Sequence, residues 1–451
     1  MNQTTIRHRL LYGLGYMGVL VPGIVFTTFV TYYYIQHIKL NPAWVGVGFG
    51  IVSVWEALIA PFVGYISDKT RTRWGRRVPY VVIGIPLVAL FLWLVFNPVF
   101  DASQPILTMA WFMITLFILD SIFMVVDVNW QAVNAEMNVD LAARSQQGAI
   151  VGVLSMVGVA IAVSITLPLT NKIGWSLTTL IIGAFSIVVG FIGVLGLKEN
   201  PNFSKGENLS LKTAVKLTLQ NQSSVFFLGL ATVVKIAMFA MSSMISLFAV
   251  WVLAIPESKS GVLLLASSGG MLVIFPIAAA LVNKLGPRKT LMVGMVIISL
   301  QSVFWFLPNI SFPVAVGLCA LSAVGNAFLL MGLMIILSDV IDADAVQVGQ
   351  RREGIYNSAN SFMQRIGAFI FSVIMGLGLN WAGFDSNLSV QSTTALWGIR
   401  GIMAGVPLVF CLLGLILIAK YPITDEKANE IRDLAIKQRE DFMKSAELVG
   451  E

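Results

Sequence analysis

The chain has 451 residues, of which 57% are apolar and only 12% carry a charge, and its formal net charge is +6 at neutral pH. So few charged side chains cannot cover a water-soluble globule of this length, which excludes the soluble classes and predicts a membrane protein that crosses the bilayer many times. The positive charge implies no nucleic-acid partner, because Lys and Arg collect in the cytoplasmic loops of such proteins.

Apolar runs long enough to cross a bilayer recur along the chain in two groups of six. A polar, lysine-rich segment separates the groups, and a charged segment follows the last run. We therefore predict an all-α polytopic membrane protein with 12 transmembrane helices in two six-helix bundles, at residues 1–197 and 224–420, joined by a cytoplasmic linker at 198–223 and followed by a cytoplasmic tail at 421–451. The runs lie at approximately 10–36, 43–67, 79–99, 105–133, 147–171, 174–197, 224–254, 260–284, 287–307, 311–338, 355–382 and 395–420.

Lys and Arg are concentrated in alternate connections between these spans. The densest cluster, at residues 69–77, lies between the second and third spans, and further basic residues lie in the linker and in the connection that contains Arg351 and Arg352. Short cytoplasmic loops carry such an excess. We therefore expect both termini to be cytoplasmic and the protein to lie in the inner (cytoplasmic) membrane of the cell.

Two motifs resemble those of a known transporter family. Residues 64–79 read G-x-x-x-D-x-T-x-x-R-W-G-R-R-x-P, and residues 339–354 read D-x-x-D-x-D-x-x-x-x-G-x-R-R-E-G. Both are similar to signatures of the glycoside-pentoside-hexuronide:cation symporters, the melibiose permease family of the major facilitator superfamily. A weaker repeat of 60–84 at 275–294 is typical of the two parallel halves of that superfamily. The resemblance implies a major facilitator fold, alternating access and secondary active transport.

Ionisable side chains inside apolar spans are costly, and they are functional candidates by default. The acid Glu56 lies in the second span, in the sequence Trp55-Glu56-Ala57-Leu58-Ile59-Ala60-Pro61. The resemblance puts Glu56 at the first of two cation-coordinating carboxylates and leaves Ala60 at the second. A single buried carboxylate favours a proton over sodium as the coupling ion. The alternative is a structural ion pair.

The fourth span carries Asp120 and Asp127, which share a helical face because they are seven residues apart. The resemblance puts Asp127 at an acid or amide of the family, and we expect it to take part in coupling. By the same resemblance Asn129, Trp130 and Gln131 follow it in the substrate site. Asp120 has no counterpart in the family and is a further candidate for the substrate site.

The eleventh span supplies Arg365, at the position of the family's intramembrane Lys. Arginine stays charged in proteins, so Arg365 can hold Glu56 or Asp127, or bind a substrate anion, but it cannot carry the coupling proton. Asn360 and Gln364 lie beside it, and Lys235 lies in the seventh span. We assign all four to the substrate site, and Arg365 to the coupling site as well. For Lys235 the alternative is a lysine that snorkels or pairs with Asp120.

A further set of charged residues belongs to the two signature motifs. In the superfamily such Asp and Arg side chains form cytoplasmic networks that hold the two halves together, so we expect a role in gating; the alternative is a role in topology alone. The set consists of Asp68, Arg71, Arg76, Arg77, Asp339, Asp342, Arg351, Arg352 and Glu353.

These features predict a transporter for a small-molecule substrate, coupled to H⁺ or Na⁺, that works as a monomer among membrane lipids. The substrate is expected to be less polar than a sugar, or anionic, because positions that bind sugar hydroxyls in the family are aliphatic here. The alternative is an uncoupled facilitator or a carrier of lysolipids or other amphiphiles. No enzyme motif, metal-binding cluster of His and Cys or cofactor motif occurs, so we expect no enzyme activity, no metal centre and no organic cofactor.

Overall fold

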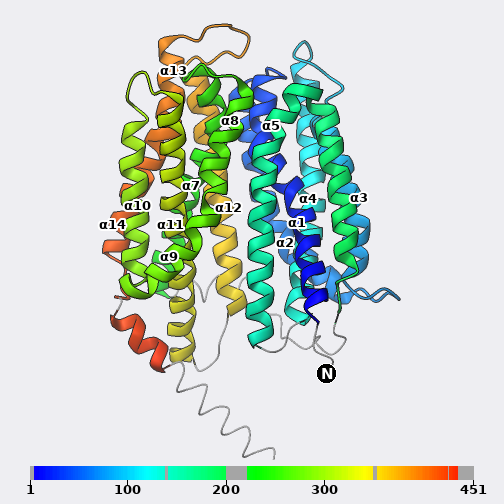
Figure 1. Cartoon of the computed structure of the whole chain (residues 1–451), viewed down its shortest axis with the longest axis vertical. Helices are drawn as coiled ribbons and strands as arrows, with labels where there is room; N and C mark the ends of the chain where they lie inside the picture. Colours follow the sequence, from blue (N-terminus) through cyan, green and yellow to red (C-terminus); the bar gives the residue numbers. More distant parts are fainter. Residues whose placement is uncertain (1–4, 138–140, 200–220, 349–352, 425, 435–451) are drawn as a thin grey trace, which may run out of the picture.

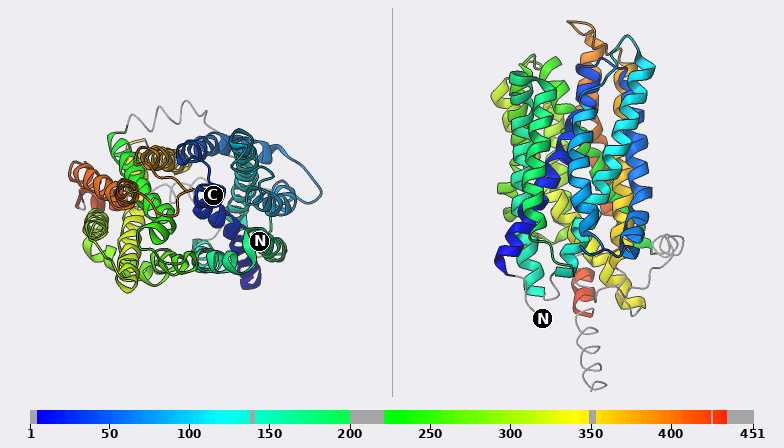
Figure 2. Two further views of the ribbon diagram at one scale, coloured as in Figure 1. Left: turned by 90° about the horizontal axis from the view of Figure 1, so that it is seen from above. Right: turned by 90° about the vertical axis from the view of Figure 1, so that its right-hand side faces the viewer.

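The computed structural model describes residues 5–434 except 138–140, 200–220, 349–352 and 425. Within these ranges the chain is built of helices that run side by side along the long axis of the molecule (Figure 1). The loops lie at the two ends of the helices. The first described residues of the chain lie at the same end of the molecule as the last described residues, as Figure 2 also shows.

The first group of helices extends to residue 194. In the fifth of these helices Gly174 has φ +79° and ψ 167°, so the helix is broken there into two spans that run in opposite directions. Glycine adopts this backbone conformation without steric cost. The helices are α1 (Ile6–Gln36), α2 (Pro42–Lys69), α3 (Val78–Val95), α4 (Pro105–Met137) and α5 (Leu141–Val194).

The second group begins at residue 222 and contains two helices that are interrupted by single π-helical turns. The first of these is α8 (Glu257–Leu264), which continues through η2 (Leu265–Gly269) into α9 (Met271–Leu285), and the second is α13 (Thr393–Arg400), which continues through η3 (Gly401–Gly405) into α14 (Val406–Ala419). The others are α7 (Gln222–Trp251), α10 (Pro287–Phe304), α11 (Phe312–Val348) and α12 (Glu353–Trp381).

Ten helical stretches in the described ranges are long and apolar enough to cross a membrane. The stretch in α5 crosses twice because of the break at Gly174. The short α10, which begins with Arg288 and Lys289, lies alongside the others in Figure 1 and adds a further crossing. These segments agree with the twelve spans predicted from hydropathy. Most of the predicted linker and of the predicted tail lies outside the described residues, and residues 426–434 of the tail form a helix.

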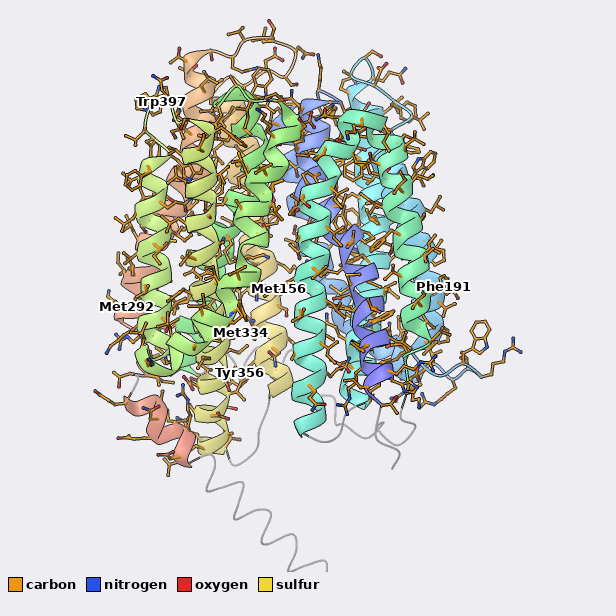
Figure 3. All side chains as sticks on the ribbon, viewed as in Figure 1. Met156, Phe191, Met292, Met334, Tyr356 and Trp397 are labelled. Carbon is orange, nitrogen blue, oxygen red and sulfur yellow. The ribbon has the colours of Figure 1, made fainter. Side chains whose placement is uncertain are left out.

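Apolar side chains cover the outer surface of the bundle. Figure 3 shows Phe191 and Trp397 projecting from its edges, and Trp397 is 54% exposed. In water such a surface would be an aggregation hazard, whereas the hydrocarbon core of a bilayer solvates it.

The two groups of helices contact each other at the end that lies away from the termini. Here α2 packs closely on α12 through Gly46 and Gly376. Asn41 Nδ2 donates a hydrogen bond to Asn380 Oδ1 at 3.0 Å, and the His37 ring lies 3.1 Å from the Glu257 carboxylate. These contacts close this end of the molecule.

We predict that Gly46→Leu disrupts this closed end. A Cβ at residue 46 would lie 2.4 Å from the Ser372 carbonyl oxygen and 2.7 Å from the Gly376 Cα, so the backbones must separate. Overpacking of this kind costs about 1–3 kcal/mol. The thermal unfolding midpoint of the purified protein should fall. Gly317→Leu is the control, because a Cβ there meets nothing within 4 Å; an equal midpoint for both variants would contradict the packing described.

Candidate functional site

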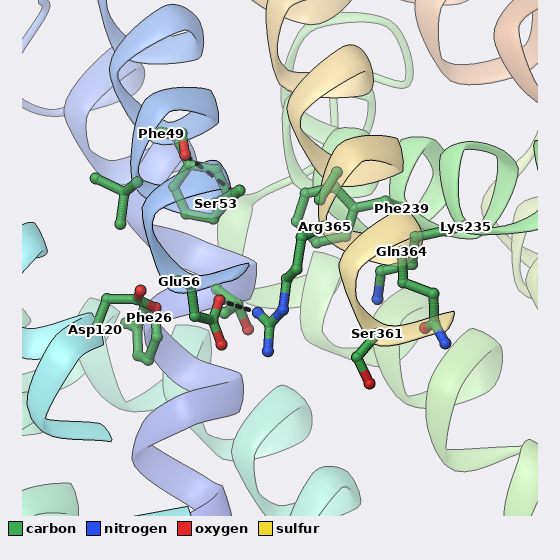
Figure 4. A pocket seen from close by; sticks show the side chains of 13 residues that line it. Phe26, Phe49, Ser53, Glu56, Asp120, Lys235, Phe239, Ser361, Gln364 and Arg365 are labelled. Carbon is green, nitrogen blue, oxygen red and sulfur yellow. Dashed lines mark hydrogen bonds and ion pairs between the residues drawn. The ribbon is translucent and has the colours of Figure 1, made fainter. Parts of the chain in front are cut away.

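A cavity of about 230 Å³ lies between the two groups of helices, and its walls carry four charged side chains. Figure 4 shows two acids, Glu56 and Asp120, on one wall and two bases, Lys235 and Arg365, on the other. The remaining lining consists of Phe26, Thr27, Phe49, Val52, Ser53, Phe239, Ser361, Gln364 and Ala368.

Helical periodicity explains how α2 and α12 present their residues to the cavity. The lining residues of α2 are Phe49, Val52, Ser53 and Glu56, and those of α12 have the same spacing at residues 361, 364, 365 and 368. Residues separated by three, four and seven positions lie on one face of an α-helix. Each helix therefore offers one continuous stripe to the cavity.

The central contact in the cavity is an ion pair between the two groups of helices. Arg365 Nη1 on α12 donates a hydrogen bond to Glu56 Oε2 on α2 (Figure 4). Glu56 is only 4% exposed. The close packing of Gly46 on Gly376, farther along the same two helices, brings the backbones near enough for this contact. The structure thus brings together two residues that the sequence analysis proposed as partners.

The other two charged residues of the cavity differ from this pair. Asp120 on α4 is 3% exposed, and its Oδ2 has no hydrogen-bond partner among the described residues. Lys235 Nζ on α7 lies 5.6 Å from the centre of the Phe239 ring, a cation–π distance. The structure records no ion pair for either residue within the described ranges. One acid and one base therefore face the cavity without a charged partner in the part of the chain that the structure describes.

Asp127 belongs to a separate polar cluster between α1 and α4. Its carboxylate accepts hydrogen bonds from the Tyr16 hydroxyl at 3.0 Å and from Gln131 Nε2 at 2.8 Å. Neither Asp127 nor Gln131 lines the cavity around Glu56. In this structure the acid predicted to act with Glu56 is thus held away from it.

Three other residues assigned to the substrate site lie outside this cavity. Trp130 is fully buried, and its ring packs on Tyr12 at a centroid distance of 5.6 Å. Asn129 is also fully buried and donates from Nδ2 to the Val125 carbonyl of its own helix. Asn360 lies on α12 but is not part of the cavity lining, whereas Gln364 is. The first two side chains therefore pack within the first group of helices.

The basic loop before α3 is fixed by an acid that the sequence analysis did not single out. The Glu199 carboxylate accepts hydrogen bonds from the backbone N–H groups of Arg76, Arg77 and Val78 at 2.6 to 2.8 Å. These groups lie at the first turn of α3, where N–H groups have no partner within the helix and negative charge is favoured. Glu199 therefore caps α3 from the end of α5.

The second signature contacts the tail. Asp339 on α11 accepts two hydrogen bonds from Arg432, one from Nε at 2.7 Å and one from Nη2 at 2.8 Å. Bidentate Arg–carboxylate contacts of this kind are geometrically specific. Asp342, on the same helix, is 9% exposed.

The other residues predicted to act in gating are Arg71, Asp68, Arg351, Arg352 and Glu353. Arg71 Nη1 donates to the Thr70 carbonyl at 3.0 Å. Arg351 and Arg352 lie outside the described residues, as do the side chains of Asp68 and Glu353.

We predict that Glu199→Ala destabilises the protein by about 0.5–2 kcal/mol, the usual cost of losing a helix N-cap. Three backbone donors of α3 would lose their common acceptor. Chemical unfolding in detergent measures the loss, and Glu199→Gln should recover part of it because the amide keeps one acceptor oxygen. Glu430→Ala, at an exposed residue of the tail, is the control; the capping role is wrong if both alanine variants unfold alike.

Comparison with known proteins agrees with this architecture. A family model described as "MFS/sugar transport protein" matches residues 11–425. The chain is 25% identical to the glucuronide carrier protein homolog of Escherichia coli K12, over 89% of each chain. It is 22% identical to the sodium-dependent lysophosphatidylcholine symporter 1-B of Danio rerio, over 98% of this chain and 92% of the relative.

Among solved structures, that of the nucleoside transporter NupG superposes with a TM-score of 0.64, covering 92% of this chain and 98% of the other. Because the identity is only 14%, this likeness shows the fold alone. The fold is that of a helical transporter with two halves, and the cavity with its ion pair lies between them.

Proposed function

Because the chain belongs to the family of MFS/sugar transport proteins and is a multi-pass membrane transporter of the glycoside-pentoside-hexuronide type, we propose that it is a symporter that couples a small organic solute to a cation. The ion pair between Glu56 and Arg365 is the observation that carries this proposal. The pair joins the two groups of helices across the cavity, so any ion that competes for Glu56 also changes the contact between them. The protein acts as a monomer in the inner membrane of the cell, with both termini cytoplasmic.

The coupling step is an exchange of cations at Glu56. Arg365 remains positively charged at all physiological pH values, so it neutralises Glu56 when no coupling ion is bound. A proton or sodium ion bound to Glu56 compensates the negative charge of the carboxylate in place of the guanidinium. Arg365 is then free to turn toward a substrate anion, and the two halves can separate at the closed end. A ligand that binds one conformation better shifts the population toward it.

Of the two ions, the sequence of α2 favours a proton, because residue 60 is alanine where the family has its second acid. Sodium is the second candidate. It is favoured by the presence of another acid, Asp120, in the same cavity, and by the name of the zebrafish relative, which is sodium-dependent.

We propose an anionic substrate of modest size. Lys235 faces the cavity beside Arg365, and no acid among the described residues pairs with it. An unpaired cation in a buried site favours the binding of an anion. The rings of Phe26, Phe49 and Phe239 offer an apolar surface to the body of the solute. The relative named as a glucuronide carrier homolog fits this class, since a glucuronide is a sugar with one carboxylate.

The second candidate is a carrier of lysolipids or other amphiphiles, as the name of the zebrafish relative suggests. The volume of the cavity argues against it. At about 230 Å³ the cavity is smaller than the roughly 300–1,000 Å³ that hold drug-sized ligands. A long acyl chain would have to lie elsewhere.

We predict that Glu56→Gln abolishes uphill transport and spares exchange. In proteoliposomes with an imposed proton or sodium gradient, the ratio of solute inside to solute outside should fall to about one. The reason is that a neutral amide does not bind the coupling cation as a carboxylate does. A panel of sugars, sugar acids and lysolipids identifies the solute. Exchange of that solute across the membrane without a gradient is the control for folding. Gradient-driven accumulation by Glu56→Gln at the normal level would refute the coupling step.

We also predict that Lys235→Met selectively weakens transport of an anionic solute. A charged hydrogen bond contributes about 1.5–3 kcal/mol, so the Michaelis constant for the anion should rise about 10- to 100-fold. A neutral analogue of the same size should be transported as by the wild type. Lys235→Arg, which keeps the charge, is the control, and an equal effect on both solutes would argue for a purely structural lysine.

A further inference from the structure

We propose that Asp120 on α4 is the second acid of the coupling site, and that it holds one monovalent cation jointly with Glu56 on α2. This inference rests on the proposed symport and adds a ligand to it. It assigns the second acid to Asp120 and not to residue 60 of α2 or to Asp127, which lies farther along α4. The shared chemistry is a single positive charge between two carboxylates, which either a sodium ion or a proton can supply.

The burial of Asp120 is the first observation. The residue is 3% exposed and lines the same cavity as Glu56, yet its Oδ2 has no hydrogen-bond partner within the described ranges. An ionised carboxylate that is buried without compensation is strongly disfavoured. Lys235 is on the opposite wall and forms no ion pair with Asp120 (Figure 4). Asp120 therefore needs a cation that the recorded contacts do not provide.

The second observation is a contact between α2 and α4 that sets Glu56 and Asp120 at the same height along the two helices. Trp55, which directly precedes Glu56, donates from Nε1 to Oγ of Ser121, which directly follows Asp120, at 3.0 Å. The Trp55 ring also packs on Phe117 of α4, with a centroid distance of 5.5 Å. These contacts fix the register of α2 against α4. Both carboxylates consequently lie on the same wall of the cavity.

Two hydroxyl groups in the lining of the cavity are further oxygen donors. Thr27 and Ser53 line the cavity, and each donates its hydrogen to a carbonyl of its own helix, Gly23 at 2.8 Å and Phe49 at 3.1 Å. A hydroxyl that donates in this way retains lone pairs for a cation. Oxygen atoms from carboxylates and neutral groups are the donors that hard cations prefer.

Asp127 offers a contrast within the same helix. It is seven residues from Asp120, or about 10 Å along an α-helix. Its two carboxylate oxygens already accept hydrogen bonds from Tyr16 and Gln131. It does not line the cavity. Of the two acids on α4, Asp120 is thus the one placed to share an ion with Glu56.

Cation binding to the purified full-length protein in lipid nanodiscs tests this inference without a known solute. One arm measures equilibrium binding of radioactive sodium at alkaline pH, and the other measures proton uptake on acidification in the absence of sodium. The variants are Asp120→Asn, Asp120→Glu and Glu56→Gln, with Asp127→Asn as the test of the other acid of α4 and Asp433→Asn, at an exposed residue of the tail, as the matched control. A retained thermal unfolding midpoint shows that each variant is folded.

We expect the wild type to bind the cation in one of these two arms. Asp120→Asn and Glu56→Gln should each weaken this binding by about tenfold or more. Asp120→Glu and Asp433→Asn should keep it. Normal cation binding by Asp120→Asn together with a loss in Glu56→Gln would overturn the inference and leave the symport proposal standing. If Asp127→Asn and Glu56→Gln lost cation binding while Asp120→Asn kept it, the second acid would be Asp127 and the inference would be overturned. A wild type that binds neither ion would overturn the symport proposal itself.

Discussion

The buried contact between the Glu56 carboxylate and the Arg365 guanidinium is the interaction on which the rest of this structure depends. Each charge would be costly in a membrane interior without the other. The two residues come from different groups of helices, so the electrostatic need of each can be met only while the groups are close together. This ion pair therefore links the two halves of the molecule. A cation that competes with Arg365 for Glu56 can consequently change how the halves are arranged.

The surrounding packing serves to position this pair. Glycines at the crossing of α2 and α12 let the backbones approach, and Trp55 locks α2 against α4 through Ser121. The hydrogen bond between Asn41 and Asn380 adds to the closure of the same end. Elsewhere the capping of α3 by Glu199 stabilises the basic loop within the first group. Packed helices thus surround a cavity with charged side chains, an arrangement that suits a carrier whose two halves move as units.

Hydropathy predicted the helices well, because a span needs about twenty apolar residues whatever its neighbours are. Helical periodicity explains why residues 49 to 56 and 361 to 368 line the cavity as stripes, but the sequence alone did not indicate which face of each helix lines it. The partner of a polar side chain depends on tertiary contacts, which a single sequence does not carry. For this reason the contacts of Glu199 and Arg432 were missed, and Trp130, expected at the substrate, is packed inside the first group of helices. Asp120 was recognised as a buried acid, but only the structure brings it into the cavity of Glu56.

The proposed coupling step requires that a cation at Glu56 changes how the two halves are arranged. Electron paramagnetic resonance measures this directly, with spin labels at Ala102 and Asn387, which lie in loops of the first and second groups at the closed end. Cys319 and Cys411 are buried and are replaced by alanine to prevent labelling. We expect the coupling cation to add a population with a longer distance between the labels in the wild type and to leave the distance distribution of the Glu56→Gln variant unchanged. A wild-type distribution that does not respond to either protons or sodium, or a Glu56→Gln variant that responds as the wild type does, would contradict it.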